Sequence, residues 1–286
     1  MGILVSVVLP LGLAFIMLSL GVGLQPADFV RVVQRPIAFF IGALHQVVAL
    51  PVIAYIVILT FGLTGETAVG IMILAACPGG VTSNILSKLA KGDVALSVSL
   101  TAVVSLVSTI TVPVILTFAL AQFMGADAPP INIVSTAIMM FLLTAVPIVL
   151  GLSLRALMPA KMMAAEPILA KIATVLFIII VVVALAANFD AFIENLLILG
   201  PALVTLVVVL TAVGYGVPSL LGRSRHEAKT VSVETGVQNS ALGIAIAAII
   251  VGGGAGFSPF ALPSAVYGIV MYLVILPIVL VYRRIN

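Results

Sequence analysis

Two short polar segments interrupt the long apolar stretches of this chain. Residues 77–84 read CPGGVTSN, and residues 234–240 read ETGVQNS. Each segment combines helix-breaking residues with side chains that carry oxygen, which is the ligand atom that hard cations prefer. The two segments therefore point to the coordination of a cation such as sodium by carboxylate, hydroxyl, amide and loosened backbone oxygens.

Glu234 is the only acidic residue well inside an apolar stretch, and no Lys or Arg lies at its depth. A buried carboxylate is costly unless it is neutralised, so its partner is a proton, a cation or a set of hydrogen-bond donors. A protonated Glu234 bonded to a neighbouring helix is the purely structural alternative. We favour a cation because acceptor oxygens are abundant in the two segments, on Ser83, Asn84, Gln238 and Asn239.

Further polar residues lie in the neighbouring apolar stretches. Ser97, Thr101, Ser105 and Ser108 follow a helical spacing and share one face. Contact between helices is the ordinary use of such small residues. Ser97 and Thr101 are also candidates to complete an oxygen cage, and Gln46 needs partners if it is buried.

The composition defines the elements that must position these residues. Of 286 residues, 63% are hydrophobic and 7% are charged, which excludes a soluble globular domain and a disordered chain. The net charge of +3 is too small to suggest a nucleic-acid partner. Cys77 is the single cysteine and the two histidines lie far apart, so a disulfide framework and a paired-histidine metal site are excluded. The chain reads as an all-α polytopic membrane protein embedded in a lipid bilayer.

A membrane-spanning helix needs about 20 mostly apolar residues. Nine such stretches are predicted, and 1–286 forms a single transmembrane unit with no soluble domain. The spans are 3–24, 36–60, 67–89, 94–123, 131–153, 168–188, 196–220, 230–251 and 260–282.

Nine spans place all twelve Lys and Arg residues on one side of the membrane. The loops on the other side contain acidic residues and no basic residue. Because positive charge accumulates on the cytoplasmic side, this pattern predicts an external N-terminus and a cytoplasmic C-terminus.

The two polar segments also resemble each other. GVTSN at 80–84 aligns with GVQNS at 236–240, five spans further along the chain. An odd offset reverses the direction of matching helices, so we expect inverted repeats whose interrupted helices, spans three and eight, cross at a midplane site.

These motifs resemble the hallmarks of the bile acid:sodium symporter family. The first runs from Cys77 to Asn84 and continues through KGDVALS at 91–97; the second is ETGVQNS at 234–240. GVGL at 21–24 before Asp28 and Phe29 fits the family's early membrane-edge segment. The resemblance covers essentially the whole chain.

The resemblance implies a mobile core domain and a flatter panel domain. The panel would contain spans 3–24, 131–153 and 168–188. The core would contain the other six, with the interrupted pair crossing inside it. The nine-span form of the family agrees with the charge pattern.

The family's ligand sets carry over by motif position. The first sodium site would comprise Ser83, Asn84, Ser97, Thr101 and Glu234. The second would comprise Gln46, Glu234, Thr235, Val237 and Gln238, with backbone carbonyls from Thr235 and Val237. Substrate contacts would come from Val81, Thr82, Asn239 and Ser240, near half-helix N-termini that favour anions.

The resemblance implies a sodium-coupled symporter, not an enzyme, that imports an organic anion with two sodium ions by alternating access. The substrate is a bile acid or a smaller carboxylate such as pantoate or a keto acid, and the expected location is a bacterial inner membrane. A proton-coupled or efflux carrier of related fold is the alternative. A passive channel is a further class, which counterflow exchange of labelled substrate distinguishes.

Overall fold

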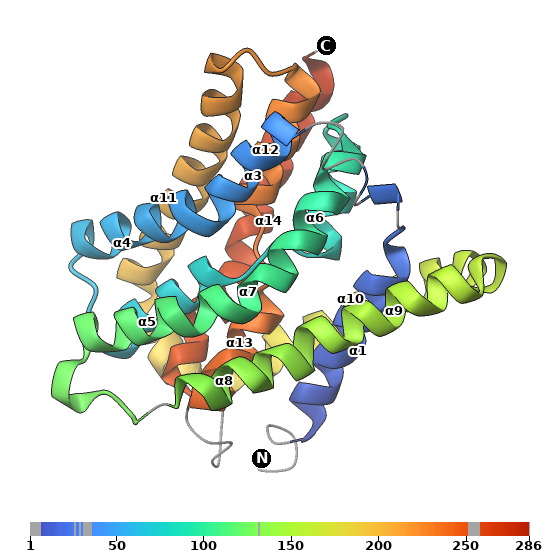
Figure 1. The fold of residues 1–286 in the computed structure, drawn as a ribbon. Coiled ribbons are helices and arrows are strands. Elements are labelled where there is room, and N and C mark those ends of the chain that lie inside the picture. The colour runs from blue at the N-terminus through green and yellow to red at the C-terminus, as the bar shows by residue number, and fades with distance from the viewer. Residues whose placement is uncertain are drawn as a thin grey trace.

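A computed structural model describes residues 7–25, 27, 28, 30, 36–130, 132–250 and 258–285 of the chain. These described residues form helices joined by short connections, with no strand among them (Figure 1). The α-helices are α1 (Leu9–Gly23), α3 (Pro36–Leu44), α4 (Leu50–Thr60), α5 (Gly65–Ala76), α6 (Val81–Leu89), α7 (Val94–Phe123), α8 (Ile133–Met140), α9 (Val146–Leu157), α10 (Pro159–Ala187), α11 (Phe189–Leu220), α12 (Arg225–Gly236), α13 (Ser240–Ile250) and α14 (Leu262–Arg284).

Seven helical segments within the described residues are long and apolar enough to cross a membrane. An eighth arises if the bent pair α5 and α6 counts as one span, and α1 is a shorter apolar helix. The seven are Pro36–Thr60, Val94–Phe123, Ile133–Leu157, Pro159–Ala187, Phe189–Leu220, Arg225–Ile250 and Pro259–Arg284. The chain is thus a multi-pass membrane protein, and nine spans remain a prediction.

The predicted span boundaries agree best with the helices of the structure where the sequence carries a strong signal for a helix start or end. Spans 36–60 and 94–123 match the helical segments. Two other predictions, 168–188 and 196–220, are too short, because the helices begin at Pro159 and Phe189. Their polar first turns lie beyond the apolar window, and α10 continues as a helix through Pro167. Predicted spans 3–24, 131–153 and 230–251 each include residues that the structure does not describe. Arg31 and Arg35, two of the twelve basic residues in the charge pattern, also lie outside the described residues.

Side-chain caps help to determine where α7 and α12 begin. The Asp93 carboxylate accepts hydrogen bonds from the backbone N–H groups of Ala95 and Leu96, both at 3.1 Å, and so caps α7. Ser224 and Glu227 form a reciprocal capping box at the start of α12. These caps help to define the start of the two helices that carry the polar residues of the site.

Both polar segments interrupt helices, as predicted. α5 and α6 are separated by Cys77–Gly80 and bent by 65°. α12 ends at Gly236 and α13 begins at Ser240. The two breaks touch, because the Asn239 backbone N–H donates to the carbonyl of Pro78 at 2.9 Å. Backbone freed from each helix is thus satisfied inside the protein.

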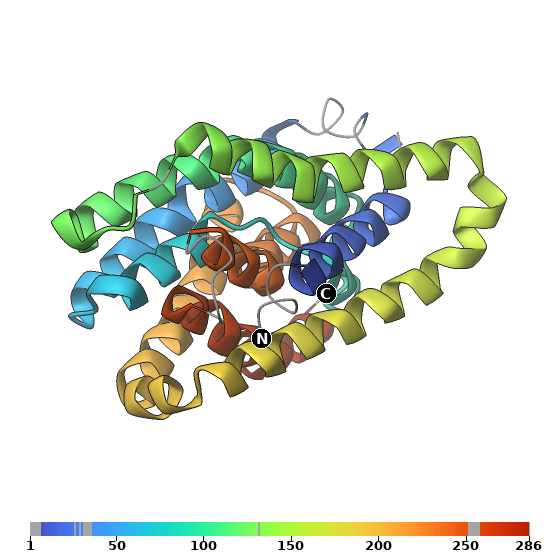
Figure 2. The same cartoon turned by 90° about the horizontal axis from the view of Figure 1, so that it is seen from below.

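Helix α1 packs against both α9 and α10. Viewed from below, α9 and α10 diverge from a turn at one end of the molecule, with α1 between them (Figure 2). Two glycines permit the close approach. A Cβ at Gly151 would lie 2.7 Å from the backbone nitrogen of Val22, and a Cβ at Gly21 would lie 2.9 Å from Ile148 Cα.

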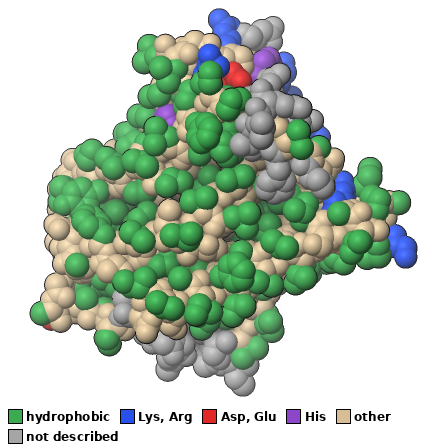
Figure 3. All heavy atoms as spheres, viewed as in Figure 1, with side chains coloured by type: hydrophobic (Ala, Val, Ile, Leu, Met, Phe, Trp, Pro, Cys, Tyr) green, Lys and Arg blue, Asp and Glu red, His purple; other side chains and the backbone are tan. Residues whose placement is uncertain are grey.

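Hydrophobic side chains cover much of the surface. On the face shown in Figure 3, the Lys and Arg side chains lie along the upper and right-hand margins. An apolar belt with charge confined to its margins is the surface that a bilayer requires.

Candidate ion and substrate site

Glu234 lies in the last turn of α12 and is 0% exposed. No Lys, Arg or His of the described chain lies within ion-pair distance of its carboxylate. Hydroxyl and amide groups from α6, α7 and the segment around Gln46 surround it instead. A deprotonated Glu234 is therefore stabilised only by hydroxyl and amide dipoles among the described residues. A bound cation would supply the counter-charge that these dipoles do not.

The five residues predicted for the first sodium site lie together. The Ser97 hydroxyl lies within hydrogen-bond distance of Glu234 Oε1 and of Asn84 Oδ1, the latter at 2.8 Å. The Thr101 hydroxyl donates to Glu234 Oε2 at 2.9 Å and lies 3.3 Å from Asn84 Oδ1. Ser83 is fully buried beside the same carboxylate. Three helices, α6, α7 and α12, thus contribute oxygens to one group.

Gly79 gives direct evidence that these oxygens converge. A Cβ placed on Gly79 would lie 2.7 Å from Glu234 Oε2, 3.0 Å from Ser83 Oγ and 3.6 Å from Thr101 Oγ1. Three oxygens therefore surround a single point beside the break between α5 and α6. A glycine at this position leaves that point free.

The residues predicted for the second sodium site form an adjoining group. The Gln46 side-chain amide donates to Glu234 Oε2 at 3.3 Å and to the Glu234 carbonyl at 3.4 Å. The Gln238 amide donates to the carbonyls of Glu234 and Thr235 at 3.3 and 2.8 Å. The Oε1 atoms of Gln46 and Gln238 are buried and have no hydrogen-bond partner among the described residues. Val237 lies beside them in the unwound break.

An irregular turn positions Gln46. Residues His45–Ala49 form one turn of π-helix between α3 and α4, followed by Pro51 in the first turn of α4. Such turns recur at functional sites because the widened helix changes the direction of its side chains. Gln46 thereby reaches α12 from a separate span.

The unwound end of α12 is held by Tyr267, whose buried hydroxyl donates to the carbonyl of Gly236 at 3.0 Å. Tyr267→Phe removes this donor and leaves a buried carbonyl unsatisfied. We expect the free energy of unfolding to fall by about 1–3 kcal/mol. Chemical denaturation in detergent measures this, with the exposed Leu273→Ala on the same helix as control. An unchanged unfolding free energy in Tyr267→Phe would contradict the stabilising role of the bond.

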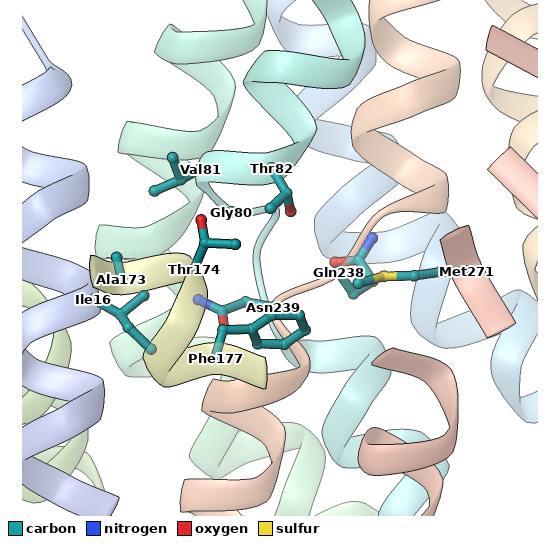
Figure 4. A pocket seen from close by; sticks show the side chains of 10 residues that line it. All are labelled: Ile16, Gly80, Val81, Thr82, Ala173, Thr174, Phe177, Gln238, Asn239 and Met271. Carbon is teal, nitrogen blue, oxygen red and sulfur yellow. The ribbon is translucent and has the colours of Figure 1, made fainter. Parts of the chain in front are cut away.

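A small cavity of about 40 Å³ lies where the two breaks meet α1 and α10 (Figure 4). Three of the four predicted substrate residues line it: Val81, Thr82 and Asn239. Ser240 is not among its lining residues; it is fully buried, and its hydroxyl has no partner in the described structure. The other lining residues are Ile16, Gly80, Ala173, Thr174, Phe177, Gln238 and Met271.

The chemistry of this cavity suits an organic anion. α6 begins at the cavity, so the partial positive charge of its N-terminus lies there. Asn239 Oδ1 accepts from the backbone of Leu242, which leaves its amide nitrogen as a donor, and Thr82 and Thr174 add hydroxyls. Ile16 and Phe177 supply apolar contact. No Lys or Arg is among the lining residues.

The sequence analysis did not identify several residues that line the small cavity. Thr174 and Phe177 lie in an ordinary apolar span, and Ile16 is one of many aliphatic residues in the first predicted span. A lone threonine in such a run is too weak a signal, because only the folded chain places α10 against the breaks.

A larger cavity of about 390 Å³ lies between α1 and α10 on one side and α6 and α7 on the other. Lys88 and Glu166 line it, and Glu166 also pairs with Arg155 of α9 at 3.1 Å. Val81 lines both cavities, which places the small one next to the large one.

Interrupted membrane helices that meet beside buried oxygens are a recurring feature of secondary transporters. The sequence profile of the sodium bile acid symporter family matches residues 10–195. The chain belongs to this family, which consists of sodium-coupled transporters and not of enzymes.

Individual relatives agree with this assignment. The chain is 29% identical to the uncharacterized sodium-dependent transporter YocS of Bacillus subtilis, over 90% of this chain and 77% of that one. It is 28% identical to the mouse ileal sodium/bile acid cotransporter, over 98% and 80% of the two chains. It is 27% identical to a probable chloroplastic sodium/metabolite cotransporter of rice, BASS2, over 82% of this chain and 55% of the relative.

Proposed function

We propose that the protein is a symporter that imports an organic anion together with two sodium ions. The observation that carries the proposal is the burial of Glu234. Its carboxylate has hydroxyl and amide hydrogen-bond partners, and no Lys, Arg or His of the described residues forms an ion pair with it. Hard cations are bound by several oxygen ligands. The two groups of oxygens around Glu234 provide such ligands from several spans.

Charge explains why the anion and sodium would bind together. Two sodium ions beside an ionised Glu234 leave one positive charge next to the small cavity. A monoanion neutralises that charge, and the cavity has no Lys or Arg among its lining residues to do so instead. The anion therefore depends on sodium for its counter-charge, which is the basis of coupling.

We further propose that access alternates by movement of a core against a panel formed by α1, α8–α9 and α10. The packing of α1 on α9 and α10 supports the panel, and the contact between Asn239 and Pro78 supports a crossing core. The larger cavity lies along the proposed boundary. Lys88, which lines this cavity, is on the predicted cytoplasmic side of the membrane. If the chain has nine spans arranged as inverted repeats, the cavity is therefore a path that is open to the cytoplasm.

The cavity dimensions suggest how the substrate would bind. A volume of about 40 Å³ accommodates a few water-sized groups, which suits a carboxylate and not a whole steroid. The larger neighbouring cavity can receive an apolar body. A small carboxylate fits the small cavity directly, and a bile acid requires both.

A thermal-stability screen tests the proposal. Purified protein is heated with bile acids, pantoate or keto acids, each in sodium or in potassium chloride. We expect sodium to stabilise the protein and one anion to add stability only when sodium is present. Equal effects of sodium and potassium would contradict sodium binding and favour the proton-coupled alternative.

Gln46→Met tests the second ion. The substitution keeps the side-chain length and removes the amide, so we expect sodium activation of uptake to need about tenfold more sodium and to lose its cooperativity. Uptake measured against sodium concentration gives both quantities, with exposed Gln122→Met as the control. An unchanged sodium dependence would remove Gln46 from the ligand set.

A further inference from the structure

A third cavity, separate from the ion and substrate site, lies beside the turn between α6 and α7 and the end of α14. Its volume is about 380 Å³, and its lining residues are Lys91, Leu280, Arg283 and Arg284. Three of these four side chains are cations. The volume is in the range of sites that bind small organic groups.

The three cations form no ion pair with the acidic residues that the structure describes. Within the described residues, no Asp or Glu lies within ion-pair distance of Lys91, Arg283 or Arg284. Glu227, at the start of α12, is used as a helix cap. Three like charges around one cavity repel one another, so an anion in the cavity would relieve that repulsion.

The backbone on both sides of the cavity is fixed to α12. Lys91 adopts a left-handed conformation with φ 56°, and its carbonyl accepts a hydrogen bond from His226 Nδ1 at 2.7 Å. On the other side, the buried Lys229 donates to the carbonyl of Ile285 at 2.6 Å. The cations therefore lie on two backbone segments, the turn at Lys91 and the end of α14, that hydrogen bonds connect to α12.

The cavity opens where a membrane-spanning helix ends. α14 is part of a candidate span, and its side chains Leu280 and Val281 are 58% and 55% exposed one turn before the arginines. Apolar side chains exposed at this level face acyl chains in a bilayer, and the cations lie at headgroup level.

We propose that this cavity binds the headgroup phosphate of an anionic phospholipid, with Leu280 against its acyl chain. Arg283 and Arg284 provide guanidinium forks that suit phosphate oxygens, and Lys91 provides a point charge. The lipid links the turn between α6 and α7 to α14, and so stabilises the end of the bundle from which α12 carries Glu234.

The test uses the purified full chain in a neutral detergent, with phosphatidylglycerol, phosphatidylcholine or inorganic phosphate added. We expect phosphatidylglycerol to raise the melting midpoint by several degrees and the other two to leave it unchanged. Lys91→Gln/Arg283→Gln/Arg284→Gln should lose this rise. The matched control Lys161→Gln/Lys171→Gln/Arg223→Gln removes three charges away from the cavity and should keep it.

A rise retained in the cavity variant, or an equal rise with phosphatidylcholine, would overturn the proposal. An equal rise with inorganic phosphate would assign the cavity to a free anion and overturn the lipid. If the triple variant does not fold, native mass spectrometry compares Arg284→Gln with Lys161→Gln. We expect fewer bound phosphatidylglycerol molecules only in Arg284→Gln; equal numbers in both would contradict the proposal.

Discussion

Glu234→Gln is expected to abolish sodium-driven uptake while leaving the protein folded. Glutamine has nearly the same shape and can still accept a hydrogen bond from Ser97 or Thr101 through its one carbonyl oxygen, but its amide nitrogen only donates and the side chain carries no charge. Because both proposed ions share Glu234, the loss removes the one anionic ligand of each. Removing an unpaired buried charge relieves its desolvation cost, so the variant should be at least as stable as the native protein without sodium.

Melting midpoints with and without sodium chloride measure this effect. A sodium concentration 100 times the dissociation constant stabilises a binding-competent protein by about 2.7 kcal/mol, and Glu234→Gln should lose this increment. Glu66→Gln removes a carboxylate from the first turn of α5 and should retain it. A sodium-dependent midpoint preserved in Glu234→Gln would exclude Glu234 as an ion ligand.

Gly79→Ala is expected to block the first ion site without removing any ligand. The added methyl would lie 2.7 Å from Glu234 Oε2 and 3.0 Å from Ser83 Oγ, at the point where the oxygens converge. The carboxylate must move or the ion must leave, so we expect sodium-driven uptake to fall by at least about 100-fold.

Gly80→Ala is the matched control. It adds the same methyl to the next residue, where no atom lies within 4 Å of the new Cβ. Gly80 caps α6 and lines the small cavity, so its methyl can affect the substrate, and the two variants are compared by the sodium-dependent rise in melting midpoint, which needs no substrate. An equal sodium-dependent rise in both variants would contradict an ion beside Gly79.

Much of the fold follows from the sequence because strong physical signals mark it. The Arg-Pro step before residue 36 and the Lys-Gly-Asp turn before residue 94 define helix starts, and Pro78 breaks span three. The break after Gly236 was harder to place, since a single glycine is a weak breaker. Hydropathy did not predict the first turns of α10 and α11, because their polar residues lie outside the apolar stretch.

The site was predictable in composition but not in detail. The isolated charge of Glu234 and the oxygen-rich breaks indicate a cation site, and the family resemblance turned Gln46, Ser97 and Thr101 from candidates into predicted ligands. The free point beside Gly79 depends on distances between spans, and the contribution of Thr174 depends on how α10 packs against the breaks. The basic cavity joins residues nearly 190 positions apart, which no local pattern reveals.

Uptake into proteoliposomes tests the coupling most directly. The vesicles contain the purified protein, and the labelled anion is the one that the stability screen selects. We predict that an inward sodium gradient drives accumulation above the equilibrium level, that an equal potassium gradient does not, and that Glu234→Gln shows no sodium effect. Equal uptake under sodium and potassium gradients would contradict sodium-coupled transport by this protein.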